Sequence, residues 1–153
     1  MSGIVGKSPF LNSNAVGKGL IGQVIQVVTD ENNSSVETTS TSFQATNLAV
    51  TITPTSVSSK IQIHAAITSD TDSNNRAIDF ALFKGDSSLV ARIWYAHGGE
   101  SRIISGHTSL YEEVPAVTTA IIYSIRFKSV GGDRVYGSYS TTYGHITATE
   151  IGA

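Results

Sequence analysis

Hydrophobic and polar residues alternate with a period of two along most of this chain, and residues 41–63 introduce the pattern. Apolar residues occupy every second position in the runs before and after Pro54. Such alternation is typical of β-strands that are buried on one face. Pro54 cannot donate a ladder hydrogen bond and should end the first strand, and Ser56, Ser58 and Ser59 favour a local reversal. Residues 41–63 are therefore predicted to form an antiparallel β unit.

The same alternation predicts strands along the rest of the chain, separated by glycine-rich or polar turns such as Gly85-Asp86. They cover residues 21–29, 77–84, 87–96, 102–113, 117–128, 134–138 and 143–151, with a polar loop over 30–40 and a break near Gly106. Because residues 21–29 are apolar on both faces, that strand should be central or face a neighbouring subunit. Nine or ten strands without a helix predict an all-β, jelly-roll-like antiparallel sandwich.

Composition narrows the class of protein without identifying it. A chain of 153 residues suits one domain, which we place at residues 21–153. The absence of cysteine excludes disulfides and cysteine-based zinc sites. A net charge of −2 without a basic patch argues against a nucleic-acid partner. No apolar run reaches the roughly 18 residues of a membrane span, so no membrane partner is expected.

Residues 1–20 form a glycine-rich segment that fits neither periodicity. Ile4, Val5, Phe10 and Leu11 make it too apolar for a solubilising tail. We expect an extended N-terminal arm that orders by lying on another surface. The alternative is a leader that packs on its own domain.

Each motif that would indicate a cofactor, metal or catalytic site lacks the neighbouring elements or residues that such a site requires. The G-x-G-x-x-G match at residues 17–22 precedes a strand instead of following one. Asp70, Asp72 and Asn74 resemble the start of a calcium loop, but its glycine and glutamate are missing. Adjacent Glu112 and Glu113 should face opposite sides of a strand, so this pair should not converge. No cofactor and no enzymatic activity are therefore expected.

The four histidines lack the spacing of metal ligands. His64 and His107 fall within predicted strands, and His97 lies beside a predicted turn. We expect them on polar faces.

Aromatic residues are the strongest candidates for contacts outside the domain. Trp94 and Tyr95 are neighbours on one predicted strand, so one of them should leave the core. The other candidates, for an interface or for glycan binding, are Tyr136, Tyr139 and Tyr143. The alternative is that these rings fill the ends of the sandwich.

Several runs, taken in order, carry a family resemblance. They are residues 22–28 (GQVIQVV), 39–43 (TSTSF), 48–54 (LAVTITP), 58–61 (SSKI), 80–85 (FALFKG), 123–128 (YSIRFK) and 146–151 (ITATEI). Over residues 22–151 the chain resembles small β-rich virion surface proteins of tailed bacteriophages. The resemblance implies a trimeric jelly-roll knob, as in capsid decoration (cement) proteins and tail-fibre tips. It offers no catalytic residue.

We therefore expect a homotrimeric decoration protein on the outer capsid surface of the virion, with the major capsid protein as partner. The arm residues Ile4, Val5, Phe10 and Leu11 would anchor it, and three arms would act together. The alternative is a receptor-binding fibre tip or lectin-like module that binds a host glycan. A polysaccharide hydrolase would need carboxylates that converge in a groove.

Overall fold

A computed structural model gives the fold of residues 22–71, 76–86, 88–97, 104–137 and 144–153. These residues are built from strands and turns and contain no helix. The strands are β1 (Val24–Asn32), β2 (Val36–Thr38), β3 (Gln44–Ile52), β4 (Lys60–Asp70), β5 (Ala77–Lys84), β6 (Ser88–His97), β7 (Ile104–Glu113), β8 (Ile121–Ser129), β9 (Val135–Gly137) and β10 (Gly144–Ile151). The predicted all-β fold is confirmed.

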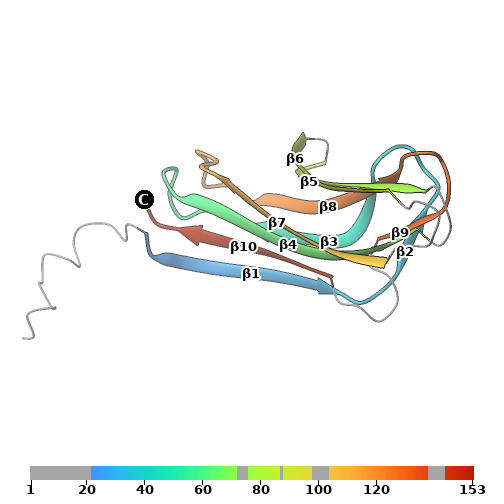
Figure 1. Ribbon diagram of the computed structural model, residues 1–153. Coiled ribbons are helices and arrows are strands. Elements are labelled where there is room, and N and C mark those ends of the chain that lie inside the picture. The colour runs from blue at the N-terminus through green and yellow to red at the C-terminus, as the bar shows by residue number, and fades with distance from the viewer. Residues whose placement is uncertain (1–21, 72–75, 87, 98–103, 138–143) are drawn as a thin grey trace, which may run out of the picture.

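Two antiparallel sheets pack against each other as a β-sandwich (Figure 1). Sheet A has the order β1-β10-β4-β7. Beyond the residues that pair with β10, the last two residues of β4 pair with β9, and β9 pairs in turn with β2. Sheet B has the order β3-β8-β5-β6. The pairings are nested along the chain, since β5 pairs with β6, β4 with β7, β3 with β8 and β1 with β10.

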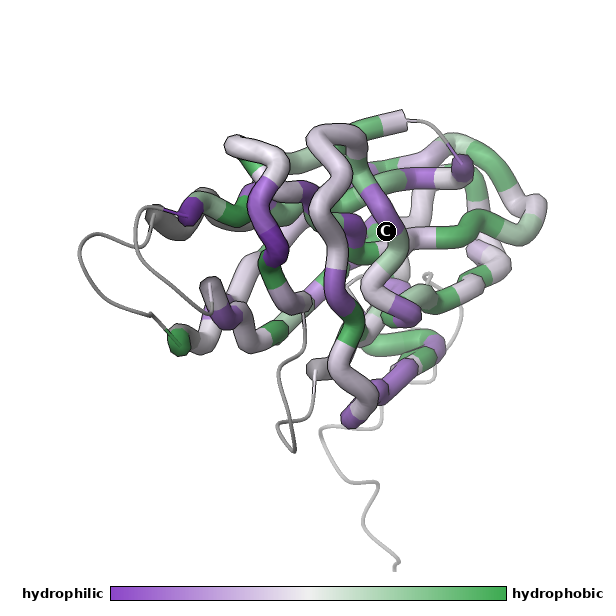
Figure 2. The backbone as a smooth tube through the Cα atoms, turned by 90° about the vertical axis from the view of Figure 1, so that its right-hand side faces the viewer, coloured by the Kyte–Doolittle hydropathy of each residue, from purple (hydrophilic) through white to green (hydrophobic). Residues whose placement is uncertain are grey.

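The core lies between the sheets and consists of the inward half of each alternating strand. Figure 2, which looks along the strands, shows that hydrophobic and hydrophilic residues alternate along the backbone. The largest fully buried apolar side chains are Leu48, Ile52, Ile61, Ile63, Ile78, Phe80, Leu82, Tyr123, Ile125, Phe127 and Ile146. Phe80 and Phe127 stack with ring centroids 5.9 Å apart, and they join β5 to β8 in the middle of the core.

Residues 41–63 do not form a paired unit, which corrects the prediction. β3 belongs to sheet B and β4 to sheet A, so the chain crosses from one sheet to the other between them. The local prediction is confirmed, because β3 ends at Ile52 before Pro54 and the Ser58 amide donates to Ser56 Oγ at 3.2 Å. The serine turn therefore forms an arch over the end of the sandwich.

β1 begins and ends three residues later than predicted and lies at an edge of sheet A, so its central placement is wrong. It pairs only with β10 among the described strands, and Val24 and Val27 are 61% and 56% exposed. Its far end contacts the other sheet, because Asp30 Oδ2 accepts a hydrogen bond from the Ala49 amide at 2.9 Å. Beside that contact β3 has a bulge, where Asn47 adopts a φ of 63°.

Three other predicted boundaries change. β8 begins at Ile121 and not at 117, since Val117 lies in the exposed connection after β7. β7 runs through Gly106 without a break. The loop predicted over residues 30–40 contains the short strand β2. The Gly85 turn is confirmed: Gly85 has a φ of 63°, and Arg126 donates to Asp86 O at 2.7 Å.

Candidate interaction surfaces

The predicted arm anchors Ile4, Val5, Phe10 and Leu11 lie outside the described residues. The arm therefore stays a prediction. Its point of departure is described, because the Gly22 amide donates to Gly152 O at 2.6 Å. Residue 22 thus lies beside the C-terminal end of the chain, at the same end of the sandwich (Figure 1).

The predicted aromatic contacts fall into three groups. Tyr139 and Tyr143 lie outside the described residues. Trp94 and Tyr95 belong to β6, where their backbones pair with Phe80 and Asp79, but the side chains of residues 92–97 are not described. Only Tyr136 has a described environment.

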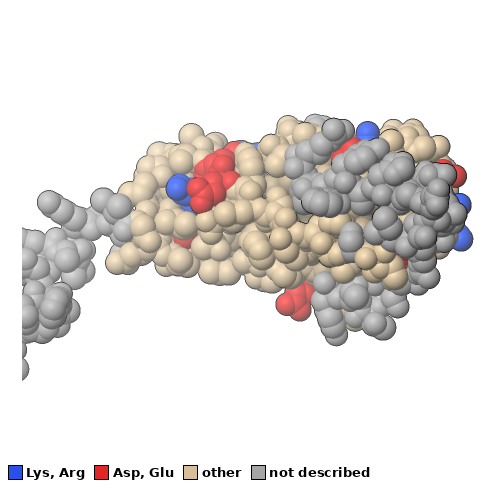
Figure 3. Space-filling view, in the orientation of Figure 1, with Lys and Arg blue, Asp and Glu red and all other residues tan. Residues whose placement is uncertain are grey.

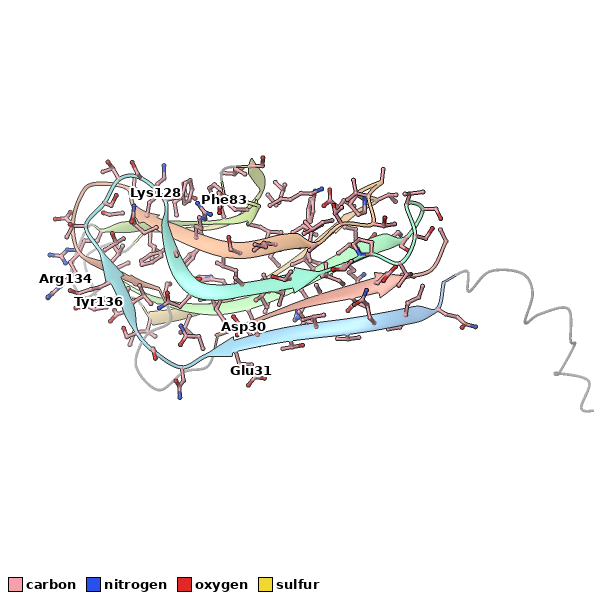
Figure 4. All side chains as sticks on the ribbon, turned by 180° about the vertical axis from the view of Figure 1, so that it is seen from behind. Asp30, Glu31, Phe83, Lys128, Arg134 and Tyr136 are labelled. Atoms are coloured by element: carbon pink, nitrogen blue, oxygen red, sulfur yellow. The ribbon has the colours of Figure 1, made fainter. Side chains whose placement is uncertain are left out.

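Tyr136 is half-buried on β9, and the Arg134 guanidinium lies 5.6 Å from the centre of its ring. Arg76 in turn donates to Arg134 O at 3.0 Å. Figure 4 shows Arg134 and Tyr136 together at one end of the sandwich, away from the start of β1. Tyrosine and arginine are both enriched at protein interfaces.

Histidine placement corrects one prediction. His64 is exposed on β4, as expected of a polar-face residue. His107 is buried between the sheets, with its Nε2 atom 2.8 Å from Ser69 Oγ. Burial lowers the pKa of His107, so it is neutral at physiological pH. Since Ser69 is also fully buried, the pair supports the core and is not presented to a substrate.

Glu112 and Glu113 face opposite sides of β7, as the strand geometry predicts. Glu112 lies on the outer side, where it accepts from Gln62 at 2.6 Å and pairs with Lys60 at 3.2 Å. Those contacts, led by the Gln62 hydrogen bond, lower the pKa of Glu112. Glu113 points towards sheet B, where it pairs with Lys84 at 2.8 Å and accepts a short hydrogen bond from Tyr123.

Glu113 thus connects the two sheets through polar contacts at the margin of the core. Burial first, and then the Glu113 hydrogen bond and charge, raise the pKa of Tyr123 far above its usual range. Tyr111 also donates to Glu113 at 3.5 Å. The two carboxylates do not converge, and Glu113 is held in an inter-sheet tie.

We expect Glu113→Gln to lower the free energy of unfolding by about 1–2 kcal/mol, because it weakens a charged bond to the Tyr123 hydroxyl and leaves Lys84 without its carboxylate. Glu112→Gln is the matched control one residue away, where an exposed pair with Lys60 contributes less than about 1 kcal/mol. Urea denaturation at pH 7 measures both variants. Equal losses would show that Glu113 is not an inter-sheet tie.

Buried Glu150 was missed by the sequence analysis. It is fully buried on β10 and accepts hydrogen bonds from Gln26 at 2.6 Å and from the Thr55 amide and hydroxyl at 2.7 Å each. The contacts join β1, β10 and the arch between β3 and β4. The available signal was the alternation of residues 146–150, which places Glu150 on the same face as Ile146 and Ala148.

The outer face of sheet A carries few charges. We define the β1–β7 face by three rows of residues that are paired across the four strands. The rows are Val27-Thr149-Gln62-Glu112, Thr29-Thr147-His64-Leu110 and Glu31-His145-Ala66-Thr108. Only Glu31 and Glu112 are acidic in these rows, and Glu112 is paired with Lys60 beside it.

The β1–β7 face combines exposed apolar side chains with small polar groups. Leu110 is 60% exposed, the hydroxyls of Thr29 and Thr147 are 3.0 Å apart, and the rings of His64 and His145 lie 5.4 Å apart. Figure 3 shows that most of the described surface in this view is tan, with one cluster of acidic and basic atoms on it and other charges towards its edges. Figure 4 shows Asp30 and Glu31 pointing to opposite sides of β1.

The outer face of sheet B also exposes apolar side chains, since Leu89 and Ile122 are 50% and 47% exposed, but it differs in carrying cations packed on aromatic rings. The Phe43 and Phe83 rings meet edge to face at 5.2 Å. Arg126 lies 4.7 Å from the Phe83 ring centre, and Lys128 lies 4.9 Å from that of Phe43. Lys128 also lies 3.8 Å from the buried Asp79 carboxylate. The cationic side chains on the outer face of sheet B therefore pack against aromatic rings of the same chain.

Among the residues that the structure describes, no three histidine or acidic side chains gather as a metal site. The calcium-like run at residues 70–75 is described only up to Thr71, and Asp72 and Asn74 lie outside the described residues. The described residues also contain no helix that could cross a membrane.

Comparisons with known proteins add no family to this description. No protein-family model matches the chain, and no curated protein matches it.

Proposed function

We propose that this chain is a structural protein of a phage virion, a decoration (cement) protein that sits on the outer capsid surface as a trimeric knob. The family resemblance of residues 22–151 motivates the proposal. Within the β-sandwich class, the fold of the protein would be a jelly roll, in which a central hairpin and the strands on either side of it wind round together.

The observation that carries this proposal is the nested strand pairing. The innermost pair is the β5–β6 hairpin, and the outermost pair is β1 with β10. Successive pairs alternate between the sheets, since β4–β7 and β1–β10 belong to sheet A and β3–β8 and β5–β6 to sheet B. This is the order expected when one long antiparallel ribbon folds into two sheets, and jelly rolls are common in capsid and lectin domains.

Attachment would come from residues 1–20, which precede the point where Gly22 is bonded to Gly152 at one end of the sandwich. A 20-residue segment reaches at most about 70 Å when extended. That length can span neighbouring capsid subunits, and three arms on one trimer would bind with the advantage of multivalency. Ile4, Val5, Phe10 and Leu11 would supply the apolar contacts.

We expect deletion of residues 1–20 to abolish co-sedimentation with purified heads of the encoding phage, because the anchoring contacts go with them. The circular-dichroism spectrum should stay that of a folded sandwich. A full-length control with Ser2, Ser8 and Asn12 changed to alanine keeps every apolar anchor and should still sediment with heads. Head binding by the deleted chain would refute the arm mechanism.

A receptor-binding or lectin-like module is the second candidate, and the Arg134–Tyr136 stack favours it. Glycan arrays would test it with Tyr136→Ala and Trp94→Ala as variants. A glycan signal that both variants abolish, together with failure to bind heads, would replace the decoration proposal.

A further inference from the structure

We propose that three copies of this chain meet through the β1–β7 face, so that three copies of sheet A enclose a triangular prism. This inference deepens the proposed function, on which it rests for the number of copies. It names the surface that the copies share.

Charge and side-chain size on this face fit a second copy of the same chain. Its middle row, Thr29-Thr147-His64-Leu110, contains no carboxylate. Two like-charged surfaces would repel, whereas small and β-branched residues let two sheets approach closely. Sheet B is less suited, because Arg126 and Lys128 stand on its outer face in every copy.

The width of the face fits three copies. Four strands spaced about 4.8 Å apart give a face about 19 Å wide. Where two faces meet at 60°, β1 of one copy and β7 of the next need about 4.8 Å between them, so each side of the triangle is about 24 Å long and its inner radius is about 7 Å. That radius is of the order of half of the about 10 Å that separates packed sheets, so side chains from the three faces would meet inside the prism.

The area of the β1–β7 face can be compared with the area that a standard protein interface buries. Eight residues of β10 span about 27 Å at about 3.4 Å per residue, so the four-stranded face covers roughly 500 Å² before side-chain relief is counted. A standard interface takes about 800 Å² of accessible surface from each partner. Because each copy of a trimer meets two others, the described face would supply the centre of each contact and not its whole area.

Strand direction supports closure at the corners of the prism. Each neighbouring pair in β1-β10-β4-β7 is antiparallel, so β1 and β7 run in opposite directions. Under threefold rotation about an axis along the strands, β1 of one copy would lie antiparallel to β7 of the next. Both edges of the face would then be covered, and exposed edges are otherwise prone to unwanted pairing.

The absence of native cysteine allows a direct test of this geometry. Thr29 and Leu110 occupy the same row at opposite edges of the face. Within one copy three strand spacings, about 14 Å, separate them, which is too far for a disulfide. Between copies they would meet at each corner.

We expect the Thr29→Cys/Leu110→Cys double variant to form covalent trimers under mild oxidation, seen on non-reducing gels. The single variants should form none. The control pair is Ala49→Cys/Leu89→Cys, which occupies one row at the opposite edges of sheet B and should stay uncrosslinked. Cross-linking of the control pair alone, or covalent dimers from the double variant that do not proceed to trimers on complete oxidation, would overturn the proposal.

A second measurement does not depend on disulfide geometry. Light scattering should give a threefold mass for the unaltered chain and for Ile122→Glu, which is exposed on sheet B. Leu110→Glu should reduce the mass to that of a monomer. A trimer that survives Leu110→Glu but not Ile122→Glu would move the interface to sheet B and leave the decoration function standing. A monomeric unaltered chain would refute this interface. The co-sedimentation assay with phage heads would still test the proposed decoration function separately.

Discussion

Phe127→Ala is expected to lower the free energy of unfolding by about 3–5 kcal/mol, the largest stability loss that we predict for one substitution. Phe127 is fully buried, and its ring stacks on Phe80. A Cβ atom built at Gly137 would lie 3.3 Å from the Phe127 ring, so the backbone of β9 packs directly on it. The cavity would therefore lie between the sheets, where neither can shift to fill it.

Such a loss would remove much of the about 5–15 kcal/mol that stabilises a typical domain. For a domain of this size it corresponds to a fall in Tm of roughly 6–20 °C. Urea denaturation at one fixed protein concentration measures it, because oligomerisation changes apparent stability. Phe43→Ala is the control, since Phe43 packs on Phe83 on the outer face of sheet B. If Phe43→Ala cost as much, the Phe80–Phe127 stack would not be the centre of the core.

Glu150→Gln is expected to destabilise the fold by about 2 kcal/mol at pH 7, because Gln26 and Thr55 would lose a charged acceptor in a buried site. Burial by itself would raise the pKa of Glu150, but hydrogen bonds led by that from Gln26 outweigh it and lower the pKa to about 2. The folded state therefore favours the ionised carboxylate more strongly than the unfolded chain does.

The pH dependence follows from that lowered pKa. The stabilisation is complete above the ordinary glutamate value of 4.5 and is lost as the pH falls towards about 2. The unaltered chain should lose this contribution across that window, whereas Glu150→Gln should show a flatter profile. Denaturation midpoints measured from pH 7 to pH 2 test this, with Glu37→Gln, which is exposed on β2, as the control. Parallel profiles for Glu150→Gln and the unaltered chain would contradict the assignment.

Local patterns predicted most strands but not their partners. The turn at Ser56 reads the same in a hairpin and in an arch, because its hydrogen bonds stay within the turn. Whether β3 pairs with β4 depends on β8 and β10, which lie far along the chain. The edge position of β1 was missed for the same reason, since the residues of a strand do not specify how many neighbours it has.

Side chains of the candidate surfaces were predictable to different degrees. The opposite directions of Glu112 and Glu113 follow from strand geometry alone. His107 was misplaced because residues 104–110 alternate weakly, so neither face of that strand was marked as the buried one. The β1–β7 face could not be predicted from one sequence, because it depends on the register of four strands that are separated along the chain.

The two hydrogen bonds between residues 22–23 and Gly152 indicate that the domain could be circularly permuted. Gly22 donates to Gly152 O and Gly152 donates to Gln23 O, so residue 22 and the C-terminal residues already lie side by side. A short linker could join them into a circle, and the chain could be reopened at the Gly85 turn of the central β5–β6 hairpin. In that permuted protein, the contacts that are now the most local in sequence would become the most distant, with the same sandwich as the end point.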